Sequence, residues 1–366
     1  MAISDLAATD AQQRSAPTAQ PIARLTDVGL VFRDGIRALD HFNLTVLPGD
    51  CMGVLGPNGA GKTSLLRLLA GLAQPSAGQI ELFGMPARHQ GIVARRRIGY
   101  VSQQSGIDQY LTGQGNLLLA GRLHGQSGGD LHKRTELLLD LVGLRNHARR
   151  QAAQYSGGMR RRLALACSLI HQPDLLLLDE PTTGLDTSGK AALWKHLLML
   201  QQAGLTIIAT SHDTQEIERY CSRVALIDRG RLVMEGTPAA LKAQIQGDLL
   251  TLAFSEAPQA SKALALLQHE SYIRSAMPGE AETQVYLEAP DGPAAIPQIT
   301  RLLEASGVVL RRLTLSRPTL EDVFFRATGT PLSDSERPSV APTEVLAQKS
   351  RHRSPFRRRS QQEVQS

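Results

Sequence analysis

The sequence predicts an α/β fold with a parallel sheet, followed by a smaller α+β domain. Short continuous apolar runs, such as Cys51–Leu55, are typical of strands that are covered on both faces. A glycine-rich loop and a segment with helical apolar spacing follow this first run, as at the start of a parallel α/β unit. The chain has 366 residues, which exceeds one typical domain of ~150, so two domains and tails are expected.

The N-terminal segment is expected to form a leader followed by a β-hairpin. Residues 1–21 are rich in Ala, Gln, Thr and Ser without an apolar period, and we interpret them as a disordered leader. From Ile22 onward, apolar residues alternate through Phe32 and again from Phe42 to Val46. These segments predict two antiparallel strands joined by a turn around Arg33-Asp34-Gly35.

The first domain, residues 22–240, takes its core from separated apolar segments. The expected helix over 64–72 follows the glycine-rich loop, and a second helix is expected over 161–170. The expected strands of the parallel sheet are 51–55, 175–178, 205–209 and 224–227.

Residues 249–329 predict a second domain of the ferredoxin-like type. The expected order is βαββαβ, a plan of that fold, with a further helix after it. The expected elements are strand 249–254, helix 260–267, strands 272–276 and 283–287, helix 294–305, strand 308–315 and helix 319–327. Because no metal or nucleophile constellation is visible there, we expect either a regulatory or dimer-supporting role or no direct function.

Composition limits the remaining possibilities. The longest apolar runs fall far short of the ~20 residues of a membrane helix, and Asp5 and Asp10 argue against a secretory signal. The cysteines Cys51, Cys167 and Cys221 stand singly, so buried thiols in a reducing compartment are expected. We therefore expect the chain to stay in the cytoplasm.

The net charge of +6 is concentrated late in the chain, between residues 349 and 359. Residues 330–366 are expected to be a disordered basic tail. Such a tail either touches anionic lipid headgroups or is simply solvated.

The glycine-rich loop over residues 56–63 matches the pattern GxxxxGK[ST]. Glycines allow backbone amides to surround phosphates, and the start of the following helix adds positive potential. We expect Lys62 to reach the β- and γ-phosphates, and the Thr63 hydroxyl to bind Mg²⁺. The sequence therefore predicts a nucleotide-binding site.

Polar residues follow two other strands of the predicted sheet. Asp179 and Glu180 end the run 175–178, and His212 follows the run 205–209. Ligands bind beyond the carboxyl ends of parallel strands, so all three should lie near the phosphates. We expect Asp179 to hold Mg²⁺, Glu180 to act as general base, and His212 to contact the γ-phosphate and the attacking water.

Ser156-Gly157-Gly158 precedes a predicted helix and forms a second candidate anion-binding end. One small domain is not expected to bring this segment and the loop at 56–63 to the same ATP. The two segments therefore favour two copies of the chain that face each other.

These motifs together resemble ABC-transporter ATP-binding proteins over residues 22–240. In that comparison residues 56–63 match the Walker A loop, Gln103 the Q-loop and residues 156–158 the signature. Asp179 and Glu180 match Walker B and the catalytic glutamate, Gly184-Leu185-Asp186 the D-loop, and His212 the switch histidine. The resemblance implies a P-loop NTPase ABC cassette with an antiparallel β subdomain and a helical subdomain. It also implies a head-to-tail homodimer that encloses two ATP molecules.

Two positions depart from the family pattern. The signature begins with Tyr155 where leucine is usual. Phe32 stands where an adenine-stacking tyrosine is usual, and either stacks on adenine or is a buried strand aromatic.

A closer resemblance is to the daunorubicin-resistance type of ABC exporter ATPase. It rests on Leu111-Thr112-Gly113, on residues 155–162 and on residues 318–324. It implies separate membrane subunits of the ABC-2 type, a drug or amphipathic substrate, and a peripheral position at the cytoplasmic face of the inner membrane. The alternative is a soluble ABC ATPase acting on ribosomes or nucleic acid, but neither a second phosphate loop nor long heptad coiled coils are visible.

The candidate site residues have three expected roles: catalysis, Mg²⁺ binding and contact with ATP. The catalytic candidates are Glu180, His212 and Gln103, and the Mg²⁺ candidates are Thr63, Gln103 and Asp179. The ATP-contacting candidates are Gly56, Pro57, Asn58, Gly59, Ala60, Gly61, Lys62, Thr63, Ser64, Phe32, Ser156, Gly157, Gly158 and Asp186.

Overall fold

The structure is a computed structural model that describes residues 20–103, 106–245, 247–279 and 281–332. The expected leader lies outside these residues except for residues 20 and 21, and the expected basic tail except for residues 330–332.

The N-terminal hairpin is confirmed and belongs to an antiparallel sheet. Its strands are paired from Ala23 with Val46 to Val31 with Arg37, with bulges between. The sheet has the order β2-β1-β4-β5. Its strands are β1 (Ala23–Val31), β2 (Arg37–Val46), β4 (Ala77–Leu82) and β5 (Met85–Pro86).

The central sheet has six strands in the order β10-β9-β3-β8-β7-β6. The strands from β9 to β6 run parallel, and β10 is antiparallel to β9. The four predicted strands are confirmed, and β6 and β10 are additional. Their bounds are β3 (Cys51–Leu55), β6 (Ile98–Val101), β7 (Leu175–Asp179), β8 (Thr206–Ser211), β9 (Arg223–Asp228) and β10 (Arg231–Gly236).

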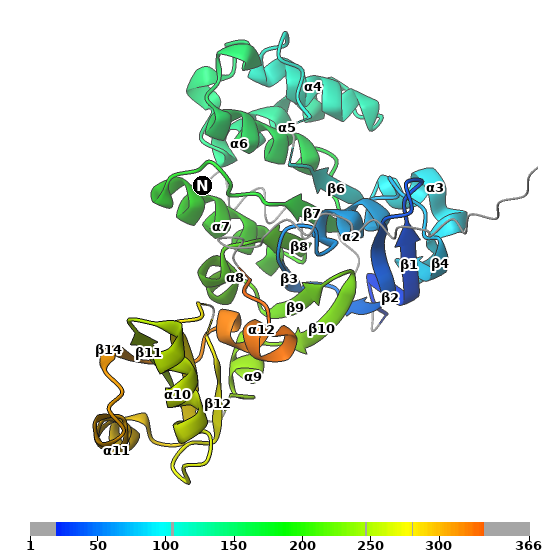
Figure 1. Cartoon of the computed structure of the whole chain (residues 1–366). Helices are drawn as coiled ribbons and strands as arrows, with labels where there is room; N and C mark the ends of the chain where they lie inside the picture. Colours follow the sequence, from blue (N-terminus) through cyan, green and yellow to red (C-terminus); the bar gives the residue numbers. More distant parts are fainter. Residues whose placement is uncertain (1–19, 104–105, 246, 280, 333–366) are drawn as a thin grey trace, which may run out of the picture. The chain divides into compact units, whose positions relative to one another are not determined.

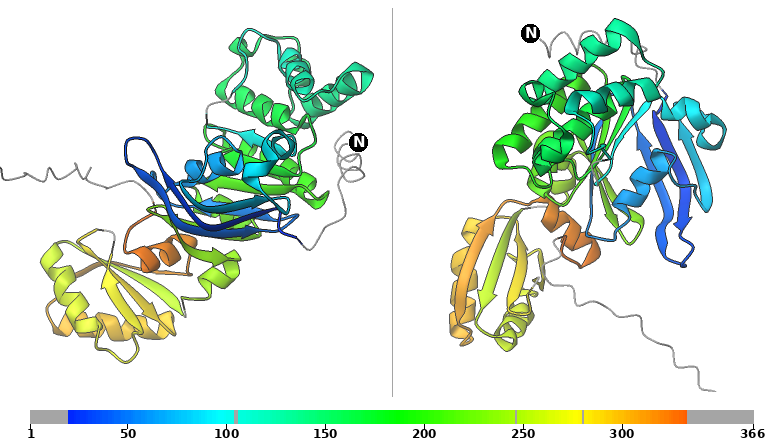
Figure 2. Two further views of the ribbon diagram at one scale, coloured as in Figure 1. Left: turned by 90° about the vertical axis from the view of Figure 1, so that its right-hand side faces the viewer. Right: turned by 90° about the horizontal axis from the view of Figure 1, so that it is seen from above.

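Helices cover this sheet and form a separate helical group (Figures 1 and 2). The helical group packs against β6 through α6, which begins at Gly157 rather than at the expected Arg161. Its elements are α4 (Gly113–Leu123), α5 (Gly128–Leu141), two short 3₁₀ turns (Arg145–His147 and Ala152–Gln154) and α6 (Gly157–Leu169). The other helices of this part are α2 (Lys62–Leu69), α3 (Ala87–Arg95), α7 (Thr187–Gln202), α8 (Thr214–Tyr220) and α9 (Pro238–Lys242).

The side chain of Tyr155 links two segments that carry the closer resemblance, the start of the signature and Leu111-Thr112-Gly113. Its ring is buried in the helical group, and its hydroxyl donates to the His147 carbonyl oxygen at 2.7 Å. A Cβ on Gly113 would lie 2.2 Å from this hydroxyl. Tyrosine at the start of the signature therefore requires glycine at position 113, so two of the three segments that carry the closer resemblance form one packing unit.

The C-terminal region has the predicted ferredoxin-like topology. Its four strands are antiparallel in the order β12-β13-β11-β14, with both helices connecting strands of that sheet. The elements are β11 (Asp248–Phe254), α10 (Ala257–Leu267), β12 (Ser275–Pro278), β13 (Gln284–Ala289), α11 (Gly292–Ala305) and β14 (Leu310–Ser316).

The predicted bounds of one strand are wrong. The apolar residues Tyr272 and Ile273 suggested a strand over 272–276, whereas β12 runs from Ser275 to Pro278. Ile273 is buried as part of the preceding turn, so its apolar character reflects packing rather than strand pairing. Pro278 is tolerated because β12 is an edge strand, where a missing backbone donor is harmless.

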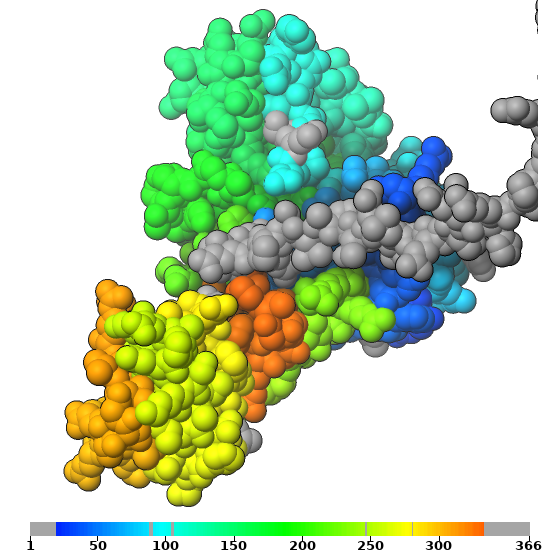
Figure 3. All heavy atoms as spheres, in the orientation of Figure 1, coloured from blue at the N-terminus to red at the C-terminus, as the bar shows by residue number. Residues whose placement is uncertain are grey.

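The last helix, α12 (Leu320–Thr328), packs against the part of the chain that contains the central sheet. Leu320, Val323 and Phe324 share one helix face and are buried in the same apolar cluster as the central sheet. The Thr214 hydroxyl at the start of α8 donates to Glu321 Oε1 at 3.0 Å. The space-filling view shows α12 (orange) adjoining the yellow-green segment of β10 and α9 (Figure 3).

Among the described residues, no helix combines the length and the apolar character that crossing a bilayer requires.

Two stacked histidines lie between the helical group and β6. The rings of His124 and His171 are 3.7 Å apart and nearly parallel, and His171 Nε2 lies 3.1 Å from the Ile98 carbonyl oxygen. Burial, and then the positive charges of His124 and Arg134, lower the pKa of His171 from 6.5 to about 4. The unfolded chain therefore binds a proton below about pH 6.5, whereas the folded chain resists it until about pH 4.

This difference predicts acid sensitivity at His171. Stability should fall as the pH drops through this window, by about 2 kcal/mol between pH 7 and pH 5 from this residue alone. His171→Gln keeps an amide donor for Ile98 but does not titrate, so its unfolding free energy should fall less over the same range. Urea unfolding at both pH values measures this, with His132→Gln, on an exposed surface of α5, as control. Parallel losses in the wild type and His171→Gln would contradict the assignment.

Candidate active site

The loop between β3 and α2 has the backbone that phosphate binding needs. Gly59 and Gly61 have φ values of 77° and 107°, a region that residues with a side chain rarely adopt. A Cβ on Gly56 would lie 2.2 Å from the Ile227 carbonyl oxygen, so packing as well as conformation requires glycine there. Asn58 and Gly59 are exposed at the tip, and α2 starts directly behind them at Lys62. The loop amides and the N-terminus of α2 therefore face one site.

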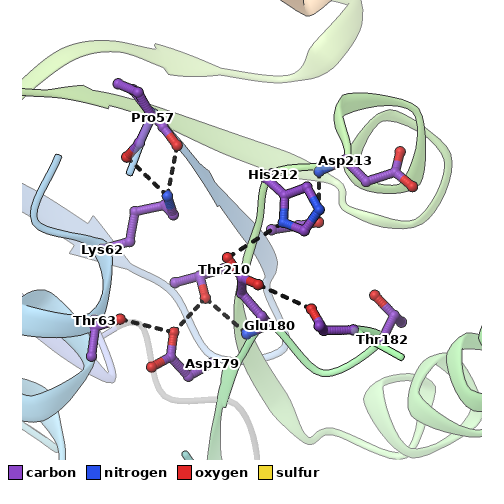
Figure 4. A network of polar contacts seen from close by, with 12 residues as sticks. Pro57, Lys62, Thr63, Asp179, Glu180, Thr182, Thr210, His212 and Asp213 are labelled. Carbon is purple, nitrogen blue, oxygen red and sulfur yellow. Dashed lines mark hydrogen bonds and ion pairs between the residues drawn. The ribbon is translucent and has the colours of Figure 1, made fainter. Parts of the chain in front are cut away.

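Lys62 is folded back against this loop. Its side chain is 7% exposed, and its Nζ donates to the carbonyl oxygens of Gly56 at 2.6 Å and of Pro57 at 3.0 Å (Figure 4). The buried Ala60 fixes the loop to the segment after β9, because its carbonyl oxygen accepts a hydrogen bond from the Gly230 amide at 2.9 Å. The ammonium is therefore held inside the loop curvature, where phosphate oxygens would be bound.

Asp179 ends β7 beside the start of α2. Its Oδ1 accepts from the Thr63 hydroxyl at 3.2 Å and from the Thr210 hydroxyl at 2.9 Å (Figure 4). Asp179 is 2% exposed, and its Oδ2 has no hydrogen-bond partner among the described residues. The structure therefore brings Thr63 and Asp179 together, as the sequence predicted.

These oxygens fit a small hard cation. A buried carboxylate oxygen without a partner is costly unless an ion or a donor binds it. Mg²⁺ prefers oxygen ligands and uses one or two protein groups together with phosphate oxygens and waters. Asp179 Oδ2 and the Thr63 hydroxyl match that requirement.

Glu180 and His212 lie next to Asp179, at the ends of β7 and β8. His212 Nδ1 is 3.4 Å from Glu180 Oε1, and the Thr183 hydroxyl donates to Glu180 Oε2 at 3.0 Å. Glu180 has a φ of 50°, and this left-handed conformation costs about 1–2 kcal/mol for a residue with a side chain. Other described residues, such as Asp27, also have a positive φ, so it is the place of Glu180 beside His212 that points to a function.

The signature segment forms a separate helix start. Ser156 is the N-cap of α6, its hydroxyl accepts from the Met159 amide at 3.2 Å, and Ser156 and Gly157 are exposed. Asp186 is exposed too and caps α7, with hydrogen bonds from Ser188 and Gly189 that lower the pKa of its carboxyl. Both segments are accessible to a second molecule.

Two predicted site residues, Gln103 and Phe32, make no hydrogen bond or ion pair with Asp179 or Glu180 in the described part of the chain. The Gln103 side chain is exposed and makes no hydrogen bond to Thr63 or Asp179 within the described part of the chain. Phe32 lies in the turn after β1 and is 39% exposed, so it is not a fully buried strand residue. Its open face leaves adenine stacking as a prediction.

Sequence reasoning missed two residues that shape the site. Thr210 binds Asp179 and also accepts from the Glu180 amide at 3.0 Å. Arg161 of α6 is buried and donates to backbone carbonyls around Asp179 and Glu180. Threonine after an apolar strand was a possible signal, but nothing in the run Arg160–Arg162 distinguished its middle residue.

The fold and this geometry define a P-loop ATPase of the ABC cassette class. The sequence model described as ABC transporter matches residues 39–183, and the one described as the C-terminal domain of DrrA1-3-like ATP-binding proteins matches residues 236–328. The chain belongs to the family of ABC transporter ATP-binding proteins, and it binds and hydrolyses ATP as a subunit of such a transporter.

Relatives match most of the chain. Daunorubicin resistance ATP-binding protein DrrA3 of Streptomyces coeruleorubidus is 40% identical, over 80% of this chain and 92% of its own. Nod factor export ATP-binding protein I of Sinorhizobium fredii is 37% identical, over 85% and 87% respectively. A dimeric post-hydrolysis structure of the cassette MJ0796 with ADP and Pi has a TM-score of 0.56 at 26% identity, over 59% of this chain and 98% of that one.

Proposed function

We propose that this chain powers an exporter whose path through the membrane is formed by separate ABC-2-type subunits, at the cytoplasmic face of the inner membrane. The observation that carries the proposal is that exporter ATPases match both the cassette and the C-terminal region. The proposed substrate class is a drug or another amphipathic molecule, since the relatives are named for daunorubicin resistance and for Nod factor export.

The proposed catalytic unit is a head-to-tail homodimer that binds two ATP molecules. The phosphate loop leads into α2, and the exposed Ser156 is the N-cap of α6, so each chain offers two anion-binding helix ends. In the dimer, each ATP would contact residues 56–64 of one chain and Ser156, Gly157 and Gly158 of the other. Asp186 would lie at the same interface, and Phe32 would stack on adenine.

The proposed chemistry uses the acid end of β7. Lys62 binds the β- and γ-phosphates, and Thr63 and Asp179 would hold Mg²⁺, with Gln103 as a further candidate ligand. Mg²⁺ supplies charge neutralisation at the phosphate oxygens when it is bound. Glu180 accepts a proton from the attacking water, and His212, 3.4 Å from that carboxylate, contacts the γ-phosphate.

The proposed coupling follows from the loss of the γ-phosphate. ATP closes the dimer because its γ-phosphate contacts both chains, and hydrolysis removes that bridge and adds charge repulsion. A membrane subunit docked near the Gln103 loop converts closure and opening into alternating access. Residues 22–240 form the ATP-binding domain in this proposal, and residues 249–329 regulate it or support the dimer.

Affinity purification tests the proposed partner. The full chain with an affinity tag is isolated from membranes in mild detergent, and the bound proteins are identified by mass spectrometry. A polytopic ABC-2-type membrane protein is expected in near-stoichiometric amount, and the pair should hydrolyse Mg²⁺-ATP and lose activity with EDTA. Recovery of ribosomal proteins or nucleic acid instead would reject the exporter and favour the alternative of an ATPase that acts on ribosomes or nucleic acid.

A further inference from the structure

Arg161 connects α6 to the Q-loop. The residue lies in the second turn of α6 and is only 7% exposed. Its Nη1 donates to the carbonyl oxygens of Ser102 at 2.6 Å and of Gln103 at 3.0 Å. Both are backbone groups, so the arginine fixes the course of the chain at the start of the Q-loop whatever the Gln103 side chain does.

The same guanidinium also binds the acid end of β7. Its Nη2 donates to the carbonyl oxygens of Asp179 and, at 2.6 Å, of Glu180, and its Nε faces the Pro181 carbonyl oxygen at 3.4 Å. Glu180 itself has a left-handed backbone, with a φ of 50°. Arg161 therefore holds the carbonyl of the strained residue itself and of both its neighbours.

The donors and acceptors match in number. A guanidinium carries five N–H groups in a rigid planar fork, and Arg161 points them at five carbonyl oxygens from two separate segments. A lysine ammonium has three donors at one point and cannot serve both segments. This arrangement requires arginine specifically, rather than any cation.

We propose that Arg161 is a positioning residue for ATP hydrolysis. By fixing the backbone of residues 179–181 it directs the Glu180 carboxylate toward the attacking water, and by fixing residues 102 and 103 it sets the start of the Q-loop. Because Ser156 is the N-cap of α6, the same contacts tie both segments to the helix that faces the partner's ATP in the proposed dimer. This inference rests on the proposed role of Glu180.

If Arg161 were only structural, its replacement would lower stability without a specific loss of kcat. Another buried arginine, Arg134, serves as the control for this possibility. Arg134 of α5 is 9% exposed and likewise donates to backbone carbonyls, those of Leu169 and Ile170, both at 2.8 Å. These two carbonyls lie at the C-terminal end of α6, the end opposite to Ser156. Arg134→Lys therefore reproduces the loss of a buried guanidinium away from the acid end of β7.

The experiment compares Arg161→Lys, Arg161→Gln and Arg134→Lys in the full chain. ATPase rates against ATP concentration and thermal unfolding are measured for each, and Arg161→Lys is also combined with Glu180→Gln. We expect the Arg161 variants to lose about 10- to 10²-fold in kcat with KM within about twofold. Arg134→Lys should melt at a similarly reduced temperature but keep its kcat. In the Glu180→Gln background, Arg161→Lys should lower kcat by a smaller factor than in the wild type, because the part of its effect that acts through the Glu180 carboxylate is already lost.

Each contrary result is decisive. Unchanged kcat in a folded Arg161→Lys variant, with Glu180→Gln inactive, overturns this inference alone. Full turnover in Glu180→Gln overturns the proposed role of Glu180 and this inference with it. If neither Arg161 variant folds while Arg134→Lys does, Arg161 is a packing residue and the proposal is wrong. Equal kcat losses in the Arg161 and Arg134 variants would reject it as well.

Discussion

Replacing Glu180 with glutamine should leave ATP binding intact and slow hydrolysis by about 10²- to 10⁴-fold, the usual contribution of a general base. Glutamine keeps the size of the side chain and an oxygen that can accept from Thr183. It cannot take up a proton from water at neutral pH. ATP should therefore stay bound with its γ-phosphate, and the chain should accumulate as a dimer.

The Glu180→Gln variant is tested by two measurements on one preparation. Steady-state phosphate release gives the rate, and light scattering after size-exclusion chromatography gives the mass with and without Mg²⁺-ATP. A suitable control is Glu136→Gln, which removes one negative charge from the exposed face of α5. Wild-type phosphate release by Glu180→Gln, or a monomer in saturating ATP, would contradict the assigned role.

The elements that the sequence predicted well are those with local signals. The strands β3, β7, β8 and β9 are short continuous apolar runs, and such runs are buried in a parallel sheet whatever their neighbours are. The phosphate loop is also a local signal, because its glycines meet a backbone requirement within a few residues. The strand β6, only four residues with a glycine inside, carried no comparable pattern.

The contacts that the sequence could not reveal join distant segments. Arg160, Arg161 and Arg162 are identical in type, but successive helix residues point in directions ~100° apart. Arg160 Nη1 donates to the Tyr155 carbonyl oxygen at 2.5 Å and Arg162 Nη1 to that of Val142 at 2.9 Å. Only Arg161 faces the acid end of β7, because α6 packs against β6 on that side. The three arginines therefore have different partners because of tertiary packing, and the local sequence does not encode that packing.

The same reason limits the prediction of α12. Its sequence predicted a helix and carried part of the closer resemblance. It did not indicate which residues of the chain the helix would contact. Glu321 accepts from Thr214, and the Leu320 amide donates to Glu218 Oε1 at 2.9 Å. Both partners belong to α8, which follows His212. A helix expected in the second domain thus completes the core of the first, and its partners on α8 follow His212 closely in the chain.

The second large effect is expected for Lys62→Ala, which should abolish measurable turnover, a loss of about 10²-fold or more, and weaken ATP binding by about 10-fold. Lys62 contributes in two ways. We expect its charge to stabilise the negative oxygens of the transferred phosphoryl group, and its hydrogen bonds to Gly56 and Pro57 hold the loop in its curve. Lys62→Met removes the charge and these bonds but keeps the apolar chain, so both variants should fail alike in turnover.

The Lys62 measurement needs a control in which a hydrogen-bonded lysine is lost outside the site. Lys262 is exposed, lies in the C-terminal region and donates to the Ser306 carbonyl oxygen at 2.8 Å. Lys262→Ala should therefore keep both turnover and ATP affinity, as measured by phosphate release and by titration with a fluorescent ATP analogue. If Lys62→Ala hydrolysed ATP at the wild-type rate, backbone amides alone would have to hold and polarise the triphosphate. The site built on residues 56–63 would then not be where ATP is hydrolysed.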